Sequence, residues 1–208
     1  MPDFKNSLKP DMLEITDSCA RVAEVIRAGG IAVCPTEGVY GLSCDIHNDE
    51  AVRRIIAIKK RNDAKGLITV ADSFARVTDL IDVASLNDRT LGLINSLWPG
   101  PFTLILPVAH IFSRSLMGAH SSLAVRVTAF EVMRRICELA RTAVVSTSAN
   151  ISGQNAVSLF SSLNEDILNL ADIALDLPCG GLEAPTTIYD TITGSLQRKG
   201  PGWEDFEL

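Results

Sequence analysis

The sequence predicts an α/β fold built on a twisted, mostly parallel or mixed sheet with helices around it. Two observations support this: amphipathic helical stretches alternate with short apolar runs typical of buried strands, and no break in composition divides the chain. The chain has 208 residues, enough for one generous domain or two small ones. We expect a single domain over 1–208, with its core at about 15–200 and short peripheral tails.

The composition is typical of a soluble globular protein, with 47% hydrophobic and 21% charged residues. No apolar run approaches the length of a membrane span, and we expect no secretory signal. The five cysteines are odd in number and widely spaced, so we expect free thiols and a cytoplasmic location. The net charge of −6 argues against broad nonspecific binding to nucleic acid.

The first half of the chain shows two helix patterns. Apolar residues at helical spacing follow Cys19, and Gly29 with Gly30 supplies a stop. Asn48 is a suitable N-cap for the next helix, which has Val52 and Ile55 on its inner face. The runs at 31–34 and 66–70 read as strands, and Asp72 could cap a short helix after the second.

The second half repeats the pattern. A helix containing Leu91 and Ile94 is stopped by the Pro-Gly-Pro sequence at 99–101. Met133 and Ile136 lie on a second helical stripe. Strands are predicted at 102–106, 123–127 and 143–145.

The segment 35–45 follows the predicted strand 31–34 directly. It brings a hydroxyl, a carboxylate and a phenol into a stretch broken by Gly38 and Gly41. Ligands often bind where strands of open α/β sheets end, so we interpret the segment as a binding loop. A simple polar turn is the alternative.

Four cations cluster at 59–65. Lys59 continues the inner stripe of its helix, Arg61 offers a planar fork, and Lys65 precedes the next strand. This arrangement suits a phosphate clamp. The alternative is that these cations merely favour the helix dipole.

Two further polar features lie beside predicted strands. Arg126 interrupts an apolar strand and shares a face with Ala124, so it could bind a carboxylate bidentately or simply face water at an edge. The segment 146–153 could offer hydroxyls and backbone N–H groups to phosphates, or form an ordinary Ser/Asn-rich turn. The chain has no P-loop and no dinucleotide fingerprint, so any ATP would bind by another route.

Six ordered motifs together closely resemble the YrdC family over about residues 15–200. They are PTEGVYGL at 35–42, KKR at 59–61 with KGLI at 65–68, WPGPFT at 98–103, LAVRVT at 123–128, STSANISG at 146–153 and PTTIYD at 185–190. Within the family, the chain resembles the short bacterial members that make threonylcarbamoyl-AMP.

The resemblance implies a deep basic cavity and a nucleotidyltransferase. The substrates would be L-threonine, bicarbonate and ATP with Mg²⁺, and the products threonylcarbamoyl-AMP and pyrophosphate. Other proteins would transfer the threonylcarbamoyl group to an adenosine beside the anticodon of tRNA. Direct binding of tRNA or RNA would be weak, and no membrane partner is implied.

The resemblance also implies roles for individual residues, with Lys59 and Arg61 as catalytic groups and no protein ligands for a metal. Threonine would be held by Thr36, Arg126, Ser146 and Thr187. ATP would be held by Arg61, Lys65, Ser122, Ser148, Asn150 and Arg198. Glu37 is a candidate general base. The chain departs from relatives at Gly38, which would loosen the loop around Thr36, and at Thr128.

Two alternatives stay open. One is a carbamoyl-adenylate-forming relative, as in hydrogenase maturation, although those chains are much longer and carry zinc-finger cysteine pairs that this one lacks. The other is an RNA-binding module that uses the basic cavity for a phosphate backbone.

Overall fold

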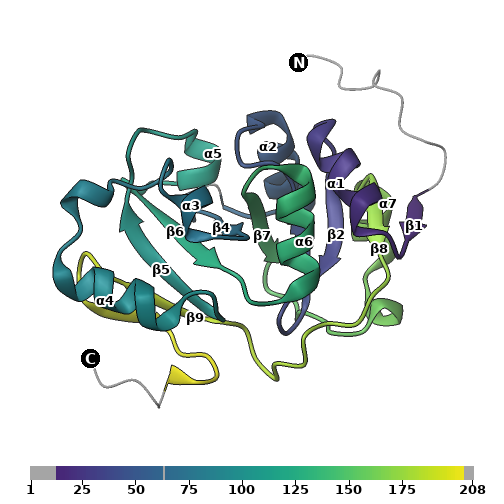
Figure 1. The fold of residues 1–208 in the computed structure, drawn as a ribbon. Helices are drawn as coiled ribbons and strands as arrows, with labels where there is room; N and C mark the ends of the chain where they lie inside the picture. Colours follow the sequence, from purple (N-terminus) through teal and green to yellow (C-terminus); the bar gives the residue numbers. More distant parts are fainter. Residues whose placement is uncertain (1–12, 63, 204–208) are drawn as a thin grey trace.

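The computed structural model describes residues 13–62 and 64–203, and their fold is built on one ten-stranded sheet (Figure 1). The strand order is β1-β8-β2-β3-β7-β4-β6-β5-β9-β10. The strands are β1 (Glu14–Thr16), β2 (Ala32–Pro35), β3 (Tyr40–Ser43), β4 (Ile68–Ala71), β5 (Phe102–Pro107), β6 (Ser122–Val127), β7 (Val144–Ser148), β8 (Ile173–Leu175), β9 (Thr187–Asp190) and β10 (Ser195–Arg198).

The sheet is mixed, so of the two predicted forms the mixed one is correct. Among the described strands, β1, β2 and β8 pair in parallel, as do β4 with β6 and β5 with β9. The remaining neighbours are antiparallel, including the hairpins β2–β3 and β9–β10.

The helices begin where short polar side chains can cap them. Ser18 and Asn48 accept hydrogen bonds from the first-turn N–H groups of α1 and α2, as the sequence predicted for Asn48. Gly29, with φ of +88°, ends α1. The helices are α1 (Cys19–Arg27), α2 (Asp49–Ile58), α3 (Phe74–Val77), α4 (Asp88–Leu97), α5 (Arg114–Met117), α6 (Glu131–Ala140) and α7 (Glu165–Leu170), with 3₁₀ turns at Val83–Ser85 and Phe160–Ser162.

Two layers of apolar side chains pack on the two faces of the sheet. Helices α1 and α6 lie side by side on one face, over β2, β8 and β4 (Figure 1). The larger core lies on the other face, where α2, α3 and α4 bury their apolar sides against Leu42, Leu104, Val125 and Val145. Among the described elements, α1 and α6 cover this face over β2, β8 and β4 and do not extend over β6, β5 and β9.

Three local predictions need correction. The segment 35–45 is not all loop, because 40–43 forms β3 and pairs with β2. Strand β7 runs on to Ser148, so the first hydroxyls of the 146–153 segment belong to a strand. Ser73, not Asp72, caps α3, since Asp72 binds Arg76 instead.

The predicted peripheral tails lie mostly outside the described residues, at 1–12 and 204–208. The part of the C-terminal tail that is described is not peripheral. Gly200 is buried, and Trp203 packs on Tyr189 with ring centroids 5.3 Å apart. The packed core therefore extends beyond residue 200.

Candidate active site

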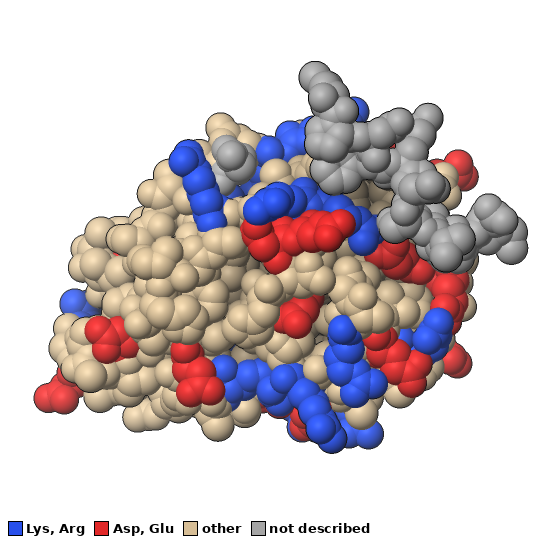
Figure 2. All heavy atoms as spheres, turned by 90° about the horizontal axis from the view of Figure 1, so that it is seen from above, with Lys and Arg blue, Asp and Glu red and all other residues tan. Residues whose placement is uncertain are grey.

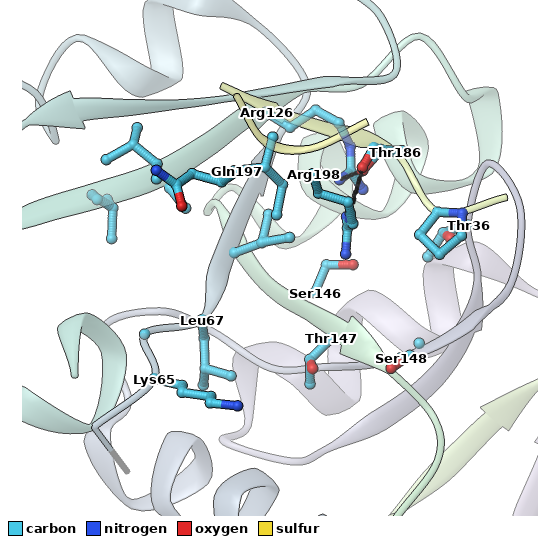
Figure 3. Close-up of a pocket in the computed structure, with 18 of the residues that line it drawn as sticks. Thr36, Lys65, Leu67, Arg126, Ser146, Thr147, Ser148, Thr186, Gln197 and Arg198 are labelled. Atoms are coloured by element: carbon cyan, nitrogen blue, oxygen red, sulfur yellow. Dashed lines mark hydrogen bonds between the residues drawn. The ribbon is translucent and has the colours of Figure 1, made fainter. Parts of the chain in front are cut away.

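A cavity of about 810 Å³ occupies the uncovered part of the sheet face (Figure 3). Its floor is a row of side chains on neighbouring strands, in which Ile68 of β4 pairs with Ala124 of β6, and Ala124 with Ile105 of β5. The sequence placed the site at strand ends. The structure instead builds it across the sheet, from side chains at alternate positions of each strand.

Arg61 and Lys65 line this cavity after α2. The Arg61 guanidinium donates to the backbone carbonyl of Gly66 at 3.0 Å and to that of Lys65 at 3.4 Å. These two hydrogen bonds hold the Arg61 guanidinium group against the segment that leads into β4. Burial lowers the pKa of Arg61, yet arginine stays protonated at neutral pH. Figure 3 places Lys65 and Arg198 on opposite sides of the cavity.

Lys59 is buried, as its place on the inner stripe predicted, but it does not line the cavity. Its ammonium donates to the carbonyl oxygens of Ser148 and Asn150, the latter at 2.8 Å, and to Asn150 Oδ1 at 3.3 Å. Burial and the nearby charge of Arg61 lower the pKa of Lys59 to about 8. Lys59 and Asn150 thus hold the end of β7 in place and are absent from the cavity wall.

Arg126 and Glu37 form a buried ion pair, with side chains only 3% and 8% exposed. Arg126 Nε lies 3.0 Å from Glu37 Oε1, and Nη2 lies 3.1 Å from Oε2. The Thr128 hydroxyl also donates to Oε1, at 2.7 Å.

This ion pair changes two expectations. The bidentate edge of Arg126, which the sequence assigned to a ligand carboxylate, is already filled by Glu37. Both oxygens of Glu37 accept hydrogen bonds, which counts against its role as a general base. Arg126 lines the cavity, and its Nη1 donates to the hydroxyl of Thr186 on the cavity wall and to that of the buried Thr103.

Strand alternation explains which hydroxyls face the cavity. Ser122 and Ser146 lie on the cavity side of β6 and β7, and Ser148 follows Ser146 by two residues. Thr36 also lines the wall and donates from Oγ1 to the carbonyl of Val39 at 2.7 Å.

Thr187 is fully buried and does not line the cavity. Its Oγ1 accepts a hydrogen bond from Gly200 N at 3.0 Å. Ile188 and Asp190 do face the cavity, so by alternation the preceding threonine that faces it is Thr186. The motif alone missed Thr186, although the alternation along β9 carried the signal.

Arg198 closes the wall from β10. Its Nε donates to the Thr186 carbonyl at 2.7 Å and its Nη2 to Thr186 Oγ1 at 3.3 Å. Burial, and then the positive charge of Arg126, lower the pKa of Arg198.

The cavity thus gathers most of the residues that the sequence singled out. Eight of them line it: Thr36, Arg61, Lys65, Ser122, Arg126, Ser146, Ser148 and Arg198. Lys59, Asn150 and Thr187 do not. Within 13–62 and 64–203, no group of three or more His, Cys, Asp or Glu side chains could hold a metal ion.

The fold and the cavity define a mixed α/β protein with a cation-lined ligand site on one face of its sheet. More narrowly, the chain belongs to the Sua5/YciO/YrdC family, described as "Telomere recombination", whose profile matches residues 24–200. The resemblance to the YrdC family is therefore confirmed.

Known relatives support the same assignment. The chain is 40% identical over 182 residues to the threonylcarbamoyl-AMP synthase of Xanthomonas campestris pv. campestris, covering 88% of this chain and 97% of that protein. It superposes on P. abyssi Sua5 complexed with L-threonine with a TM-score of 0.82 and 28% identity over 91% of this chain. It spans only 57% of the P. abyssi chain.

A third relative shows the fold alone. E. coli YciO superposes with a TM-score of 0.76 at 22% identity, covering 92% of this chain and 95% of that one.

Proposed function

We propose that this protein is an L-threonylcarbamoyladenylate synthase, a nucleotidyltransferase of tRNA modification. One observation carries the proposal: Arg61, Lys65 and Arg198 line a single cavity together with the hydroxyls of β6 and β7. That combination suits a polyphosphate beside a small polar substrate. The synthase from Xanthomonas campestris and the threonine-bound P. abyssi Sua5 support it.

The reaction needs no nucleophile from the protein. The amine of L-threonine would attack bicarbonate or CO₂, and the resulting carbamate oxygen would attack the α-phosphorus of ATP. Pyrophosphate would leave, giving threonylcarbamoyl-AMP, with one water formed when bicarbonate is the carbon source. Catalysis would then consist of positioning the substrates and offsetting the phosphate charge.

The residues divide naturally between two substrates. Arg61, Lys65, Ser122, Ser148 and Arg198 line the cavity and would bind ATP. Thr36 and Ser146 line the same cavity and would bind threonine near Arg126. Lys59 and Asn150 would act on this site through the end of β7, as positioning residues in place of phosphate ligands.

Magnesium fits this site only as a companion of the nucleotide. Asp190 lines the cavity, but its Oδ1 already accepts hydrogen bonds from Ile192 N and Thr193 N. We infer that Mg²⁺ is held by phosphate oxygens and water, where it would neutralise charge on the leaving pyrophosphate.

The proposal includes a cytoplasmic location and downstream proteins that transfer the threonylcarbamoyl group to tRNA. All five cysteines are free, which supports a reducing compartment. The described part of the chain contains no helix long and apolar enough to cross a membrane.

An RNA-binding module remains the competing class. The face in Figure 2 carries acidic side chains close to many of its basic ones, which weakens the case for a broad basic surface there. On α6, for example, Arg134 is paired with Glu131 and Glu138. RNA binding would weaken steeply with salt, whereas a threonine site would respond to threonine stereochemistry.

The deciding experiment measures product. The purified protein is incubated with ATP, Mg²⁺, bicarbonate and L-threonine, and threonylcarbamoyl-AMP is detected by mass together with pyrophosphate. Product should require both bicarbonate and L-threonine, and D-threonine should not replace the latter. Pyrophosphate release that is absent, or independent of threonine, overturns the proposal. Release of phosphate instead indicates an ordinary ATPase.

A further inference from the structure

A second cavity, of about 600 Å³, lies next to the substrate cavity and shares a wall with it. Gly38, in the turn between β2 and β3, and Tyr40, at the start of β3, line both cavities. Most of the other lining residues belong to the β8–β9 connection (176–186), which runs past that turn (Figure 1). No step of the proposed reaction uses this second cavity.

The side chains that line the second cavity are largely apolar. Leu159, Phe160, Leu177 and Leu182 are among them, and Leu159 is 65% exposed. The rings of Tyr40 and Phe160 meet edge to face, with centroids 5.8 Å apart. A ligand with a hydrocarbon body would remove this apolar surface from water, and aromatic rings also attract cations.

Two carboxylates give the second cavity a negative charge. Asp176 and Glu183 both line it from the β8–β9 connection, and both are exposed. No cation of the described residues forms an ion pair with either of them. ATP and bicarbonate are anions, so they do not match this cavity. A ligand that carries two positive charges on a hydrocarbon chain does match it.

Backbone hydrogen bonds connect the second cavity to the loop that carries Thr36. Gly180 N donates to Thr36 O and Leu182 N donates to Glu37 O, each at 2.9 Å. The β8–β9 connection is therefore bonded to the same loop that lines the substrate cavity. A ligand that immobilises the connection would also immobilise this loop.

Tyr40 adds a side-chain link between the two cavities. Its hydroxyl donates to Leu177 O at 2.5 Å. Burial, and then the neighbouring Cys179 and Asp176, raise the pKa of Tyr40 to about 12, so the phenol keeps the proton of this bond at neutral pH. The wall between the cavities is thus held from both sides.

We propose that the second cavity binds aliphatic polyamines, which carry ammonium groups joined by methylene chains, and that this binding strengthens the binding of L-threonine. The ammonium groups would pair with Asp176 and Glu183, and the methylene chain would pack on the leucines and Phe160. The coupling to L-threonine rests on the proposed function, whereas the polyamine site itself does not.

Calorimetric titration of the full chain with spermidine measures the site. ATP is left out, because polyamines also bind its phosphates. The double variant Asp176→Asn with Glu183→Gln should weaken spermidine binding about 5- to 30-fold, since two partly exposed ion pairs are lost. Glu165→Gln with Asp166→Asn is the matched control. It removes the same charge at exposed positions of α7 that do not line the cavity, and should leave the affinity unchanged.

A ligand series separates charge from apolar contact. A terminal diaminooctane has the same chain length as spermidine and should bind similarly. The corresponding octanediol lacks the charges and should bind about tenfold more weakly or worse. Amide shifts of the isotope-labelled protein should change at 176–183 and not at 61–68. At saturating spermidine, L-threonine should bind about fivefold more tightly, and the Asp176/Glu183 double variant should lose this gain.

The polyamine site is ruled out if spermidine does not bind, if it binds both double variants equally, or if octanediol matches diaminooctane. Amide shifts at 61–68 in place of 176–183 have the same meaning. Unchanged L-threonine affinity at saturating spermidine overturns the coupling. A protein that binds spermidine in the second cavity but never binds L-threonine supports the polyamine site and contradicts the proposed function, so the two failures are distinguishable.

Discussion

Lys59 and Asn150 are 91 residues apart in the chain, yet the Lys59 ammonium donates to both the backbone oxygen and the side-chain oxygen of Asn150. These bonds tie the end of α2 to the end of β7. A lysine is therefore used as a buried structural link inside a site whose other cations face a cavity.

The buried Lys59 should make stability depend on pH. Its folded pKa of about 8 lies below the unfolded value of 10.5, so the unfolded chain binds more protons between these values. The free energy of unfolding should thus rise from pH 7.5 to 9.5, by roughly 2 kcal/mol from this group.

Urea unfolding at the two pH values measures this rise. Lys59→Met should abolish that part of the increase, whereas Lys60→Met at the exposed neighbour should preserve it. The same pH dependence in Lys59→Met and the wild type would contradict the prediction.

Arg61→Ala should reduce turnover by about 100-fold or more, because it removes a charge-assisted contact to phosphate. Arg61 lies at the cavity wall and outside the apolar core, so the melting temperature should change little. Arg53→Ala is a matched control, because Arg53 lies on α2, is exposed and forms an ion pair with Asp49. Pyrophosphate release at saturating threonine measures both variants, and normal turnover of Arg61→Ala would rule out the phosphate role.

Glu37→Gln should destabilise the protein by about 3–5 kcal/mol, since it leaves the buried charge of Arg126 without its counterion. Glu131→Gln removes an exposed partner of Arg134 and should cost under about 1 kcal/mol. Denaturant unfolding at neutral pH compares the two. A similar decrease in the free energy of unfolding in both variants would contradict the prediction that the buried Glu37–Arg126 pair matters more for stability than an exposed pair.

Gly38→Ala should destabilise the protein by about 1–3 kcal/mol, because a Cβ there would lie 2.9 Å from Leu182 O and 3.1 Å from Ala184 O. Gly92→Ala is the opposite case. Nothing lies within 4 Å of a Cβ at Gly92, which is in α4, so alanine should stabilise by about 1 kcal/mol. Thermal unfolding of the two variants should shift in opposite directions, and a neutral Gly38→Ala would refute the packing argument.

The structure around Gly38 contradicts the expectation that this glycine loosens the loop around Thr36. The carbonyls of 182 and 184 approach so closely that glycine is needed for tight packing. Thr128, the second departure from relatives, has a structural role as well, since its hydroxyl holds Glu37 and accepts from Phe130 N.

Helices α1, α2, α3, α4 and α6 were predictable because their signals are local, whereas the short helices α5 and α7 were not predicted. Caps such as Asn48 and apolar residues at helical spacing lie within one or two turns of each other. Strand β3 was missed because it contains Gly41 and lies within a few residues of β2. Strands β9 and β10 were missed because they are short and carry polar residues, of which Asp190, Gln197 and Arg198 line the cavity.

Which residues line the cavity was easier to predict than the contacts that these residues make. The motifs located the cavity wall, but Glu37 and Arg126 are 89 residues apart, and no spacing rule reveals that they pair. The position of Lys59 on the inner stripe of its helix was predicted correctly. Its hydrogen-bond partners at the end of β7 could not be predicted, because they depend on the order of strands in the sheet.

The strand order has one more consequence. Thr36 follows the second strand and Arg198 ends the tenth, yet both line the same cavity. A growing chain cannot assemble this wall until β10 has left the ribosome and docked beside β9. Ligand affinity should therefore appear only with the complete fold, and substrates should act as folding ligands that shift the equilibrium toward the full-length native state.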